Sequence, residues 1–227
     1  MNVDGVYVGE PSVLGHRRER PVLSAITKAR VTAPELALTE LNLEGDRQAD
    51  LTVHGGVDKA VYVYPAEHYA AWREDGFEVA TADFGENISL SGVTEDDVRV
   101  GDVWAWGDAL VQVSQPRSPC YKLAMKTGRK DVTPAMIDSL RSGWYLRVLR
   151  PGTVPTSGAL ELVERADAPT IAEVYVISFA NYGQLPPDKI EAALDFADRV
   201  LATPALAVSW SAGIQSTVDR WRERHAG

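Results

Sequence analysis

A single cysteine, Cys120, lies in a short segment whose composition suits thiol chemistry. Pro116 and Pro119 fix their own φ angles and bias the residues before them toward extended backbone, so the preceding strand is expected to end here. Ser118 is a candidate N-cap with Pro119 at the first helical position, which predicts a short helix over 119–127. Cys120 would then lie in the first helical turn, where free backbone N–H groups favour a thiolate.

Two cations flank this cysteine and act in the same direction. Arg117 and Lys122 add positive charge that favours the ionised thiol. The alternative is that Cys120 is a small core residue, because free cysteine is among the most buried residue types. The cap, the prolines and the cations together favour a reactive or metal-binding thiol.

A glycine pair marks a second candidate region. Gly55 and Gly56 follow a β-type run and permit a close approach of the backbone to a ligand. Arg47, His54 and Lys59 lie near them in the sequence. A hairpin turn that binds nothing explains the glycines equally well, so the pair does not identify a site on its own.

A third candidate is the amide of Asn87, at the start of a predicted strand. Its side chain could hydrogen-bond a heteroaromatic ring or a phosphate, since it carries both a donor and an acceptor. An Asx-type turn is the alternative that requires no ligand. The sequence leaves both open.

Composition excludes several classes of protein. The net charge is −9, with 32 acidic against 23 basic residues, which argues against a general nucleic-acid binder. One cysteine cannot form an internal disulfide or ligate an iron–sulfur cluster, and no glycine-rich dinucleotide motif follows a strand. Redox work would therefore need electrons from a partner. The lack of a secretory signal or membrane-length apolar run and the lone thiol predict a reducing, cytoplasmic location.

The elements around the cysteine are mostly short strands. The clearest hairpin signal joins 103–106 to 109–113 through Gly107-Asp108, and its second strand leads directly into the cysteine segment. Regular alternation of strands and helices is missing, which indicates an α+β fold that is mainly β and barrel-like. We assign this domain to residues 1–165.

The pattern becomes helical after residue 165. Thr170 and Glu173 form a capping-box signature, and apolar residues beyond it keep helical spacing. Three helices are predicted, over about 171–181, 187–202 and 209–225. We assign residues 166–227 to a small helical domain.

Five motifs in this order resemble those of the MOSC family and, within it, the YiiM-like proteins. The motif around the cysteine is long and specific, whereas the others are short. The match spans most of residues 1–165. The matching strings are Leu43–Asp46, Val53–Ala60, Phe84–Asn87, Gly101–Val103 and Ser114–Leu123.

The resemblance implies a domain that binds the molybdenum cofactor, a pterin whose dithiolene holds the metal, with Cys120 as the protein ligand to molybdenum. A cluster of Arg47, Lys59 and Arg117 with glycine N–H groups would suit the terminal phosphate of the pterin. The motif positions that become candidate cofactor contacts are His54, Gly55, Gly56, Lys59, Asn87 and Arg117.

Three hypotheses follow. The first, implied by the resemblance, is a reductase of N-hydroxylated compounds such as hydroxylaminopurines, which receives electrons from an external protein. The second is a module that carries the cofactor, or a sulfur group on Cys120, without turnover. The third makes Cys120 a nucleophile with His54 as its base, which requires the two side chains to lie within hydrogen-bond reach.

Overall fold

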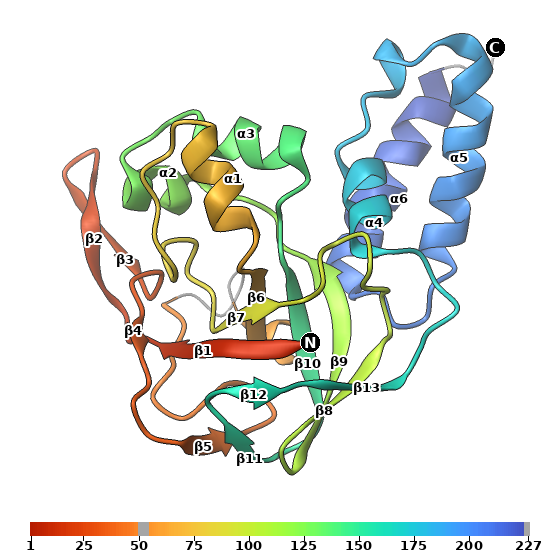
Figure 1. Cartoon of the computed structure of the whole chain (residues 1–227). Coiled ribbons are helices and arrows are strands. Elements are labelled where there is room, and N and C mark those ends of the chain that lie inside the picture. Colours follow the sequence, from red (N-terminus) through yellow and green to blue (C-terminus); the bar gives the residue numbers. More distant parts are fainter. Residues whose placement is uncertain (50–54, 225–227) are drawn as a thin grey trace.

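The computed structural model describes residues 1–49 and 55–224. Strands outnumber helices in the first 164 residues, and the chain is helical beyond them (Figure 1). The strands are β1 (Asn2–Val8), β2 (Ser12–Arg17), β3 (Arg20–Ser24), β4 (Ala29–Arg30), β5 (Glu35–Leu38), β6 (Val61–Pro65), β7 (Ile88–Ser91), β8 (Val103–Trp106), β9 (Ala109–Pro116), β10 (Trp144–Arg150), β11 (Gly152–Pro155), β12 (Gly158–Ala159) and β13 (Glu161–Glu164). The helices are α1 (His68–Glu74), α2 (Tyr121–Thr127), α3 (Val132–Ser139), α4 (Ile171–Ser178), α5 (Pro187–Leu201) and α6 (Val208–Arg224), with 3-10 turns η1 (Val57–Lys59) and η2 (Tyr182–Gln184).

One curled sheet forms the centre of the molecule. In the described part of the chain its strand order is β12-β1-β7-β6-β10-β9-β8-β13, and β4 pairs with β1. All of these pairs are antiparallel except β6 with β7. The predicted α+β, mainly β, barrel-like fold is therefore confirmed, and so is the β8–β9 hairpin with its Gly107-Asp108 turn.

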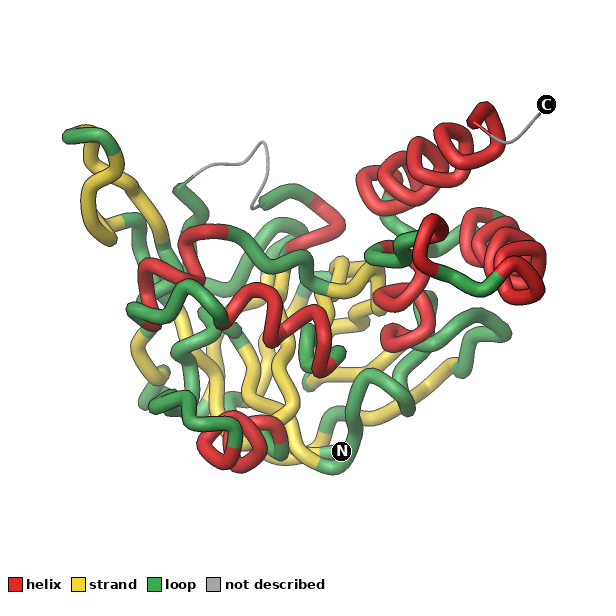
Figure 2. The backbone as a smooth tube through the Cα atoms, turned by 90° about the horizontal axis from the view of Figure 1, so that it is seen from above, coloured by secondary structure: helices red, strands yellow, loops and turns green. Residues whose placement is uncertain are grey.

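Helices cover the sheet in two groups. α1, α2 and α3 lie over one end of the barrel, whereas α4, α5 and α6 stand together beside it (Figures 1 and 2). The second group begins at the predicted capping box, in which the Thr170 side chain accepts from the Glu173 N–H and the Glu173 carboxylate accepts from the Thr170 N–H. The three predicted C-terminal helices are present, although α4 ends three residues early.

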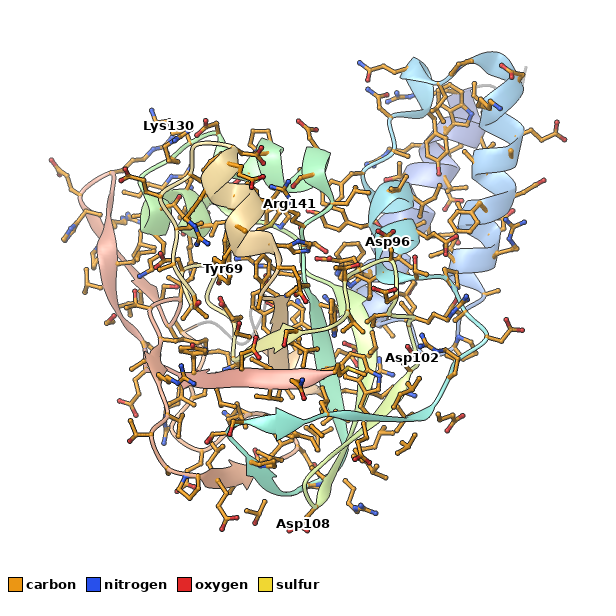
Figure 3. The ribbon with its side chains drawn as sticks, viewed as in Figure 1. Tyr69, Asp96, Asp102, Asp108, Lys130 and Arg141 are labelled. Atoms are coloured by element: carbon orange, nitrogen blue, oxygen red, sulfur yellow. The ribbon has the colours of Figure 1, made fainter. Side chains whose placement is uncertain are left out.

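The C-terminal helices share a core with the sheet. A single hydrophobic cluster includes Val113 and Leu146 of the sheet together with Val174 of α4 and Ile214 of α6. The Asp102 carboxylate, labelled in Figure 3, also accepts from Arg165 Nη1 at 3.0 Å and from the backbone N–H of residue 166 at 2.9 Å. The helices are thus attached to the barrel by packing and by hydrogen bonds. The division into domains 1–165 and 166–227 remains a prediction.

A second cluster lies beneath α1 and is rich in aromatic rings. Tyr64 stacks on Phe84 with ring centroids 4.7 Å apart, and Trp72 Nε1 donates to the Tyr64 hydroxyl at 2.6 Å. The tyrosine hydroxyls of the cluster donate to groups at its edge, which are the carbonyls of Ser142 and Arg141 and the carboxylate of Glu86, as their polarity requires. No helix within residues 1–49 and 55–224 combines the length and apolar character needed to cross a membrane.

Candidate functional site

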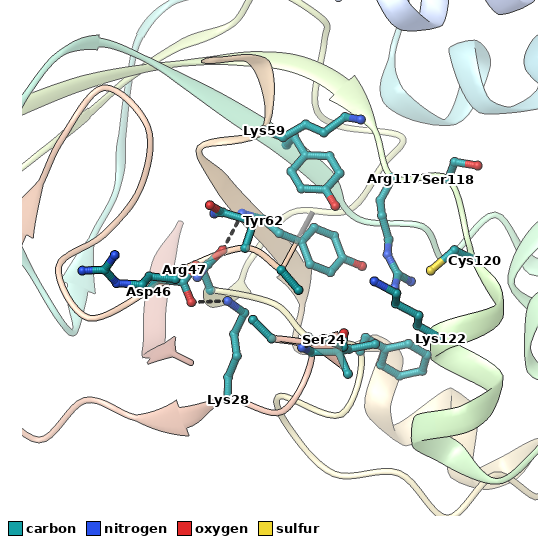
Figure 4. A pocket seen from close by; sticks show the side chains of 18 residues that line it. Ser24, Lys28, Asp46, Arg47, Lys59, Tyr62, Arg117, Ser118, Cys120 and Lys122 are labelled. Atoms are coloured by element: carbon teal, nitrogen blue, oxygen red, sulfur yellow. Dashed lines mark hydrogen bonds and ion pairs between the residues drawn. The ribbon is translucent and has the colours of Figure 1, made fainter. Parts of the chain in front are cut away.

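A pocket opens between the base of the β2–β3 hairpin, η1, β6 and the segment that leads into α2 (Figure 4). The space inside it is about 670 Å³ and is partly open to solvent. The polar and charged side chains around it are those of Ser24, Lys28, Asp46, Arg47, Gln48, Lys59, Tyr62, Asn87, Arg117, Ser118, Cys120, Lys122 and Tyr145.

Cys120 lines this pocket and is half-buried. The interpretation of this thiol as a sealed core residue is therefore wrong. The predicted helix start is also wrong, because α2 begins at Tyr121 and Cys120 is its N-cap, with an extended backbone (φ −131°, ψ 164°). Its carbonyl accepts from the Leu123 N–H at 2.9 Å, while its side chain makes no capping hydrogen bond. The thiol therefore borders the pocket and does not cap α2.

Arg117 is buried beside the thiol. Its guanidinium lies 5.2 Å from the centre of the Tyr62 ring, donates to Met136 Sδ at 3.4 Å and hydrogen-bonds the Tyr145 phenol. Burial acts to lower the pKa of Arg117, but the Tyr62, Tyr145 and Cys120 side chains outweigh it, so the pKa is raised. No carboxylate in the described part of the chain forms an ion pair with this guanidinium. The group is a permanent positive charge next to the sulfur.

Two tyrosines form the wall behind Arg117. Tyr62 of β6 and Tyr145 of β10 are register partners, and their ring centroids lie 5.2 Å apart. Burial raises the pKa of both phenols, so both keep their protons across the physiological range. Sequence analysis missed both residues, because all five residues of β6 are buried and no alternation shows which side faces a pocket. Knowledge of the β6–β10 pairing would have placed them together.

The opposite wall holds a buried ion pair that sequence analysis also missed. Lys28 Nζ pairs with Asp46 Oδ1, which also accepts from the Gly9 N–H at 2.9 Å. The other carboxylate oxygen, Asp46 Oδ2, is buried and has no hydrogen-bond partner among the described residues. Burial lowers the pKa of Lys28, and the carboxylate of Asp46 opposes this shift.

Two further predicted cofactor contacts, Lys59 and Arg47, also lie at this pocket. Lys59 lines the pocket, and burial lowers the pKa of its amine against the opposing effect of Asp58. Arg47 also lines it, although its side chain is 74% exposed and lies 3.7 Å from Glu10. Figure 4 shows the charged ends of these two side chains directed away from each other, so each would meet an anion separately.

The Asn87 amide makes two hydrogen bonds to the main chain. Its Oδ1 accepts from the Tyr62 N–H at 3.0 Å, and its Nδ2 donates to the Tyr7 carbonyl at 3.1 Å. The side chain therefore bridges β1 and β6 and does not form the Asx-type turn that the sequence left open. Asn87 borders the pocket, and its contact with a cofactor remains a prediction.

The glycine pair lies outside the main pocket. Gly56, at φ 96°, borders an adjacent hollow together with Arg47, while Gly55 borders neither. His54 falls outside the described residues, so the hypothesis that pairs it with Cys120 is untested. In the parts of the chain that the structure describes, no three His, Cys, Asp or Glu side chains gather to hold a metal ion.

Comparison with known proteins identifies the family. A MOSC domain model matches residues 50–160. Protein YiiM of Escherichia coli is 42% identical over 215 residues, which cover 92% of this chain and 89% of that protein. A protein named reductase from Gibberella moniliformis is 31% identical over 151 residues, 63% of this chain and 26% of its own. The crystal structure of YiiM from Geobacillus stearothermophilus is 34% identical and matches with a TM-score of 0.76 over 95% of this chain and 98% of its own. The chain therefore belongs to the MOSC domain family, among its YiiM-like proteins.

Proposed function

We propose that this protein is a molybdenum-cofactor-dependent reductase of N-hydroxylated compounds, such as hydroxylaminopurines, that receives electrons from a partner protein. The observation that carries the proposal is the single thiol, Cys120, at a pocket beside the buried cation Arg117. The overall reaction would convert R–NHOH, two electrons and two protons into R–NH₂ and water. A relative that is named a reductase supports redox chemistry of this general kind.

The residues present fit the cofactor. A thiolate is a soft ligand that suits a sulfur-bound metal, and the dithiolene of the pterin would bring further sulfur ligands. Lys59 and Arg47 both line the pocket, and either cation would suit the phosphate of the pterin. When bound, the cofactor would supply the two-electron chemistry at its molybdenum, as is general for such groups.

The chain itself would bind, orient and hold charge. The Arg117 guanidinium would stabilise negative charge on the Cys120 sulfur, since the two lie close enough to interact electrostatically. The Tyr62 and Tyr145 phenols keep their protons because burial raises the pKa of each. Tyr62 donates its proton to the Ser142 carbonyl at 2.9 Å, whereas Tyr145, which accepts from Arg117, could donate a hydrogen bond at the pocket wall. A cytoplasmic location fits this chemistry, because reducing conditions keep a lone thiol free.

The test is to purify the protein from a host that makes the cofactor and to measure its metal and its turnover. We expect molybdenum in the purified protein and reduction of 6-hydroxylaminopurine with a chemically reduced viologen as electron donor. The Cys120→Ala variant should lose both. A Cys120→Ala variant that keeps full metal content and full activity would refute the proposal.

The carrier hypothesis predicts a different outcome of the same assay. A carrier would retain molybdenum and depend on Cys120, yet it would show no catalytic reduction with the viologen donor. Repeated turnover by the isolated protein therefore separates the two functions.

A further inference from the structure

Arg147 of β10 joins three segments that lie far apart in the sequence. Its Nε and Nη2 atoms contact Asp58 Oδ1 at 2.9 and 2.8 Å, and Nη1 donates to Gln112 Oε1 at 3.1 Å. Nη2 also donates to the Ala205 carbonyl at 2.9 Å, in the loop between α5 and α6. One planar guanidinium thus holds η1, β9 and the helical extension (α4–α6) together.

The same loop also reaches the end of β9 that leads to the cysteine. The backbone N–H of Ala207 in this loop donates to the Ser114 carbonyl at 3.1 Å, and Ser209 Oγ, in the first turn of α6, donates to Gln115 Oε1 at 3.4 Å. Ser114 Oγ in turn donates to the Asp58 carbonyl at 2.6 Å. The α5–α6 loop is therefore bonded, directly or through one side chain, to both Asp58 and Ser114.

These two attachment points lie next to the pocket. Asp58 immediately precedes Lys59, and Ser114 belongs to the β9 end from which the chain continues to Arg117 and Cys120. Contacts at both points fix the backbone that presents a cation on one side and the thiol on the other. Ala205 and Ala207, the two loop residues that make these bonds, do not line the pocket themselves.

We propose that Arg147 is a positioning residue through which the helical extension fixes Lys59 and the segment carrying Cys120. What the pocket holds rests on the proposed function, but the positioning role does not. The geometry requires a guanidinium, because its forked donors reach Asp58, Gln112 and Ala205 at once, whereas an ammonium is a compact point charge. The network couples the extension to the pocket.

The alternative is that Arg147 only strengthens the interface between the extension and the barrel. Its loss would then lower global stability without a local effect on the pocket. Amide hydrogen exchange separates the two roles, because local opening and global unfolding differ in which amides respond. The N–H groups to follow are those of Lys59, bonded to the Gly56 carbonyl at 2.9 Å, and Ala207.

The experiment compares Arg147→Met and Asp58→Ala with a matched control on the same strand, Arg150→Met. Arg150 is exposed and donates to the Asp108 carbonyl at 3.1 Å, and Figure 3 shows Asp108 at the end of the barrel opposite α1–α3. We expect exchange of the Lys59 and Ala207 amides to rise about tenfold in the first two variants and to stay at the wild-type rate in the control. Arg147→Lys should give an intermediate rate.

A second readout uses the fact that the chain has one cysteine. The alkylation rate of Cys120 by iodoacetamide should change by about threefold or more in Arg147→Met, because thiol reactivity follows local charge and access. Wild-type exchange at Lys59 and Ala207 in Arg147→Met, or equal effects of Arg147→Met and Arg150→Met, would overturn the proposal. Neither readout needs the cofactor, so a wild-type protein without molybdenum would refute the proposed function and leave this result intact.

Discussion

Two buried cations stand on different walls of the pocket and differ in their partners. Lys28 forms an ion pair with Asp46, and both side chains are almost completely buried. Arg117 is equally buried, but its described neighbours are the rings of Tyr62 and Tyr145, the Met136 sulfur and the Cys120 thiol. One cation is neutralised within the protein, and the other keeps its charge.

This difference indicates separate roles for the two walls. A buried charge is costly unless it is paired, so the Lys28–Asp46 pair is most simply explained as part of the fold. A buried cation without a carboxylate is available to an anionic group, here a thiolate or a bound ligand. We therefore expect substitutions on the Lys28 wall to act on stability and substitutions on the Arg117 wall to act on binding.

The largest expected effect comes from Asp46→Asn. Removing one partner of a buried pair leaves an uncompensated charge on Lys28, and the free energy of unfolding should fall by about 3–5 kcal/mol. The loss should be greatest at low pH. Because burial lowers the pKa of Lys28, the folded chain binds fewer protons than the unfolded chain between that pKa and 10.5, so the unfolding free energy of the variant rises with pH there.

Urea denaturation at several pH values measures this effect. Glu10→Gln is the matched control, because Glu10 and Arg47 form a pair whose side chains are 73% and 74% exposed. That substitution should change the unfolding free energy by less than about 0.5 kcal/mol. If Asp46→Asn and Glu10→Gln lowered the unfolding free energy by the same amount, the buried pair would contribute no more to stability than the exposed pair, which contradicts the prediction.

The second prediction concerns Arg117→Met, which replaces the guanidinium with a shorter, unbranched apolar chain. The unfolding free energy should stay within about 1 kcal/mol of wild type or rise, because a costly buried charge is removed. Molybdenum content should fall by about tenfold, since the charge beside the sulfur is lost. If Arg117→Met were as destabilised as Asp46→Asn and kept its molybdenum, Arg117 would act on stability and not on binding, which contradicts the roles given to the two walls.

The smallest expected effect on stability is that of Cys120→Ser. Cys120 occupies the N-cap of α2 without a side-chain capping bond, whereas serine is a favoured N-cap residue. Thermal denaturation should show stability raised by about 0.5–1 kcal/mol, while the molybdenum content should fall. A loss of more than about 1 kcal/mol would mean that the thiol contributes to packing, as the core interpretation held.

Local patterns in the sequence predicted the local elements well. The β8–β9 hairpin, the Thr170 capping box and the three C-terminal helices each depend on a few neighbouring residues, and all are present. The start of α2 was misplaced because the fixed φ of Pro119 suits an extended segment as well as a first helical turn. The observed chain stays extended through Cys120 and begins the helix at Tyr121, two residues later than predicted.

The pocket walls could be predicted only in part. Cys120, Arg117 and Lys59 stood out by residue type and motif, and the structure brings all three to one pocket. Tyr145 and Lys28 arrive there through sheet pairing and loop packing between distant segments, which local signals do not encode. Residue chemistry therefore identified the thiol, and topology supplied its surroundings.

X-ray absorption at the molybdenum edge tests the central claim most directly, because it counts the sulfur ligands of the metal. Wild-type protein and Cys120→Ser should be compared after loading with the cofactor under identical conditions. Our account predicts one sulfur ligand fewer in the metal that Cys120→Ser retains, or no retained metal at all. An unchanged sulfur shell at full molybdenum content would contradict it.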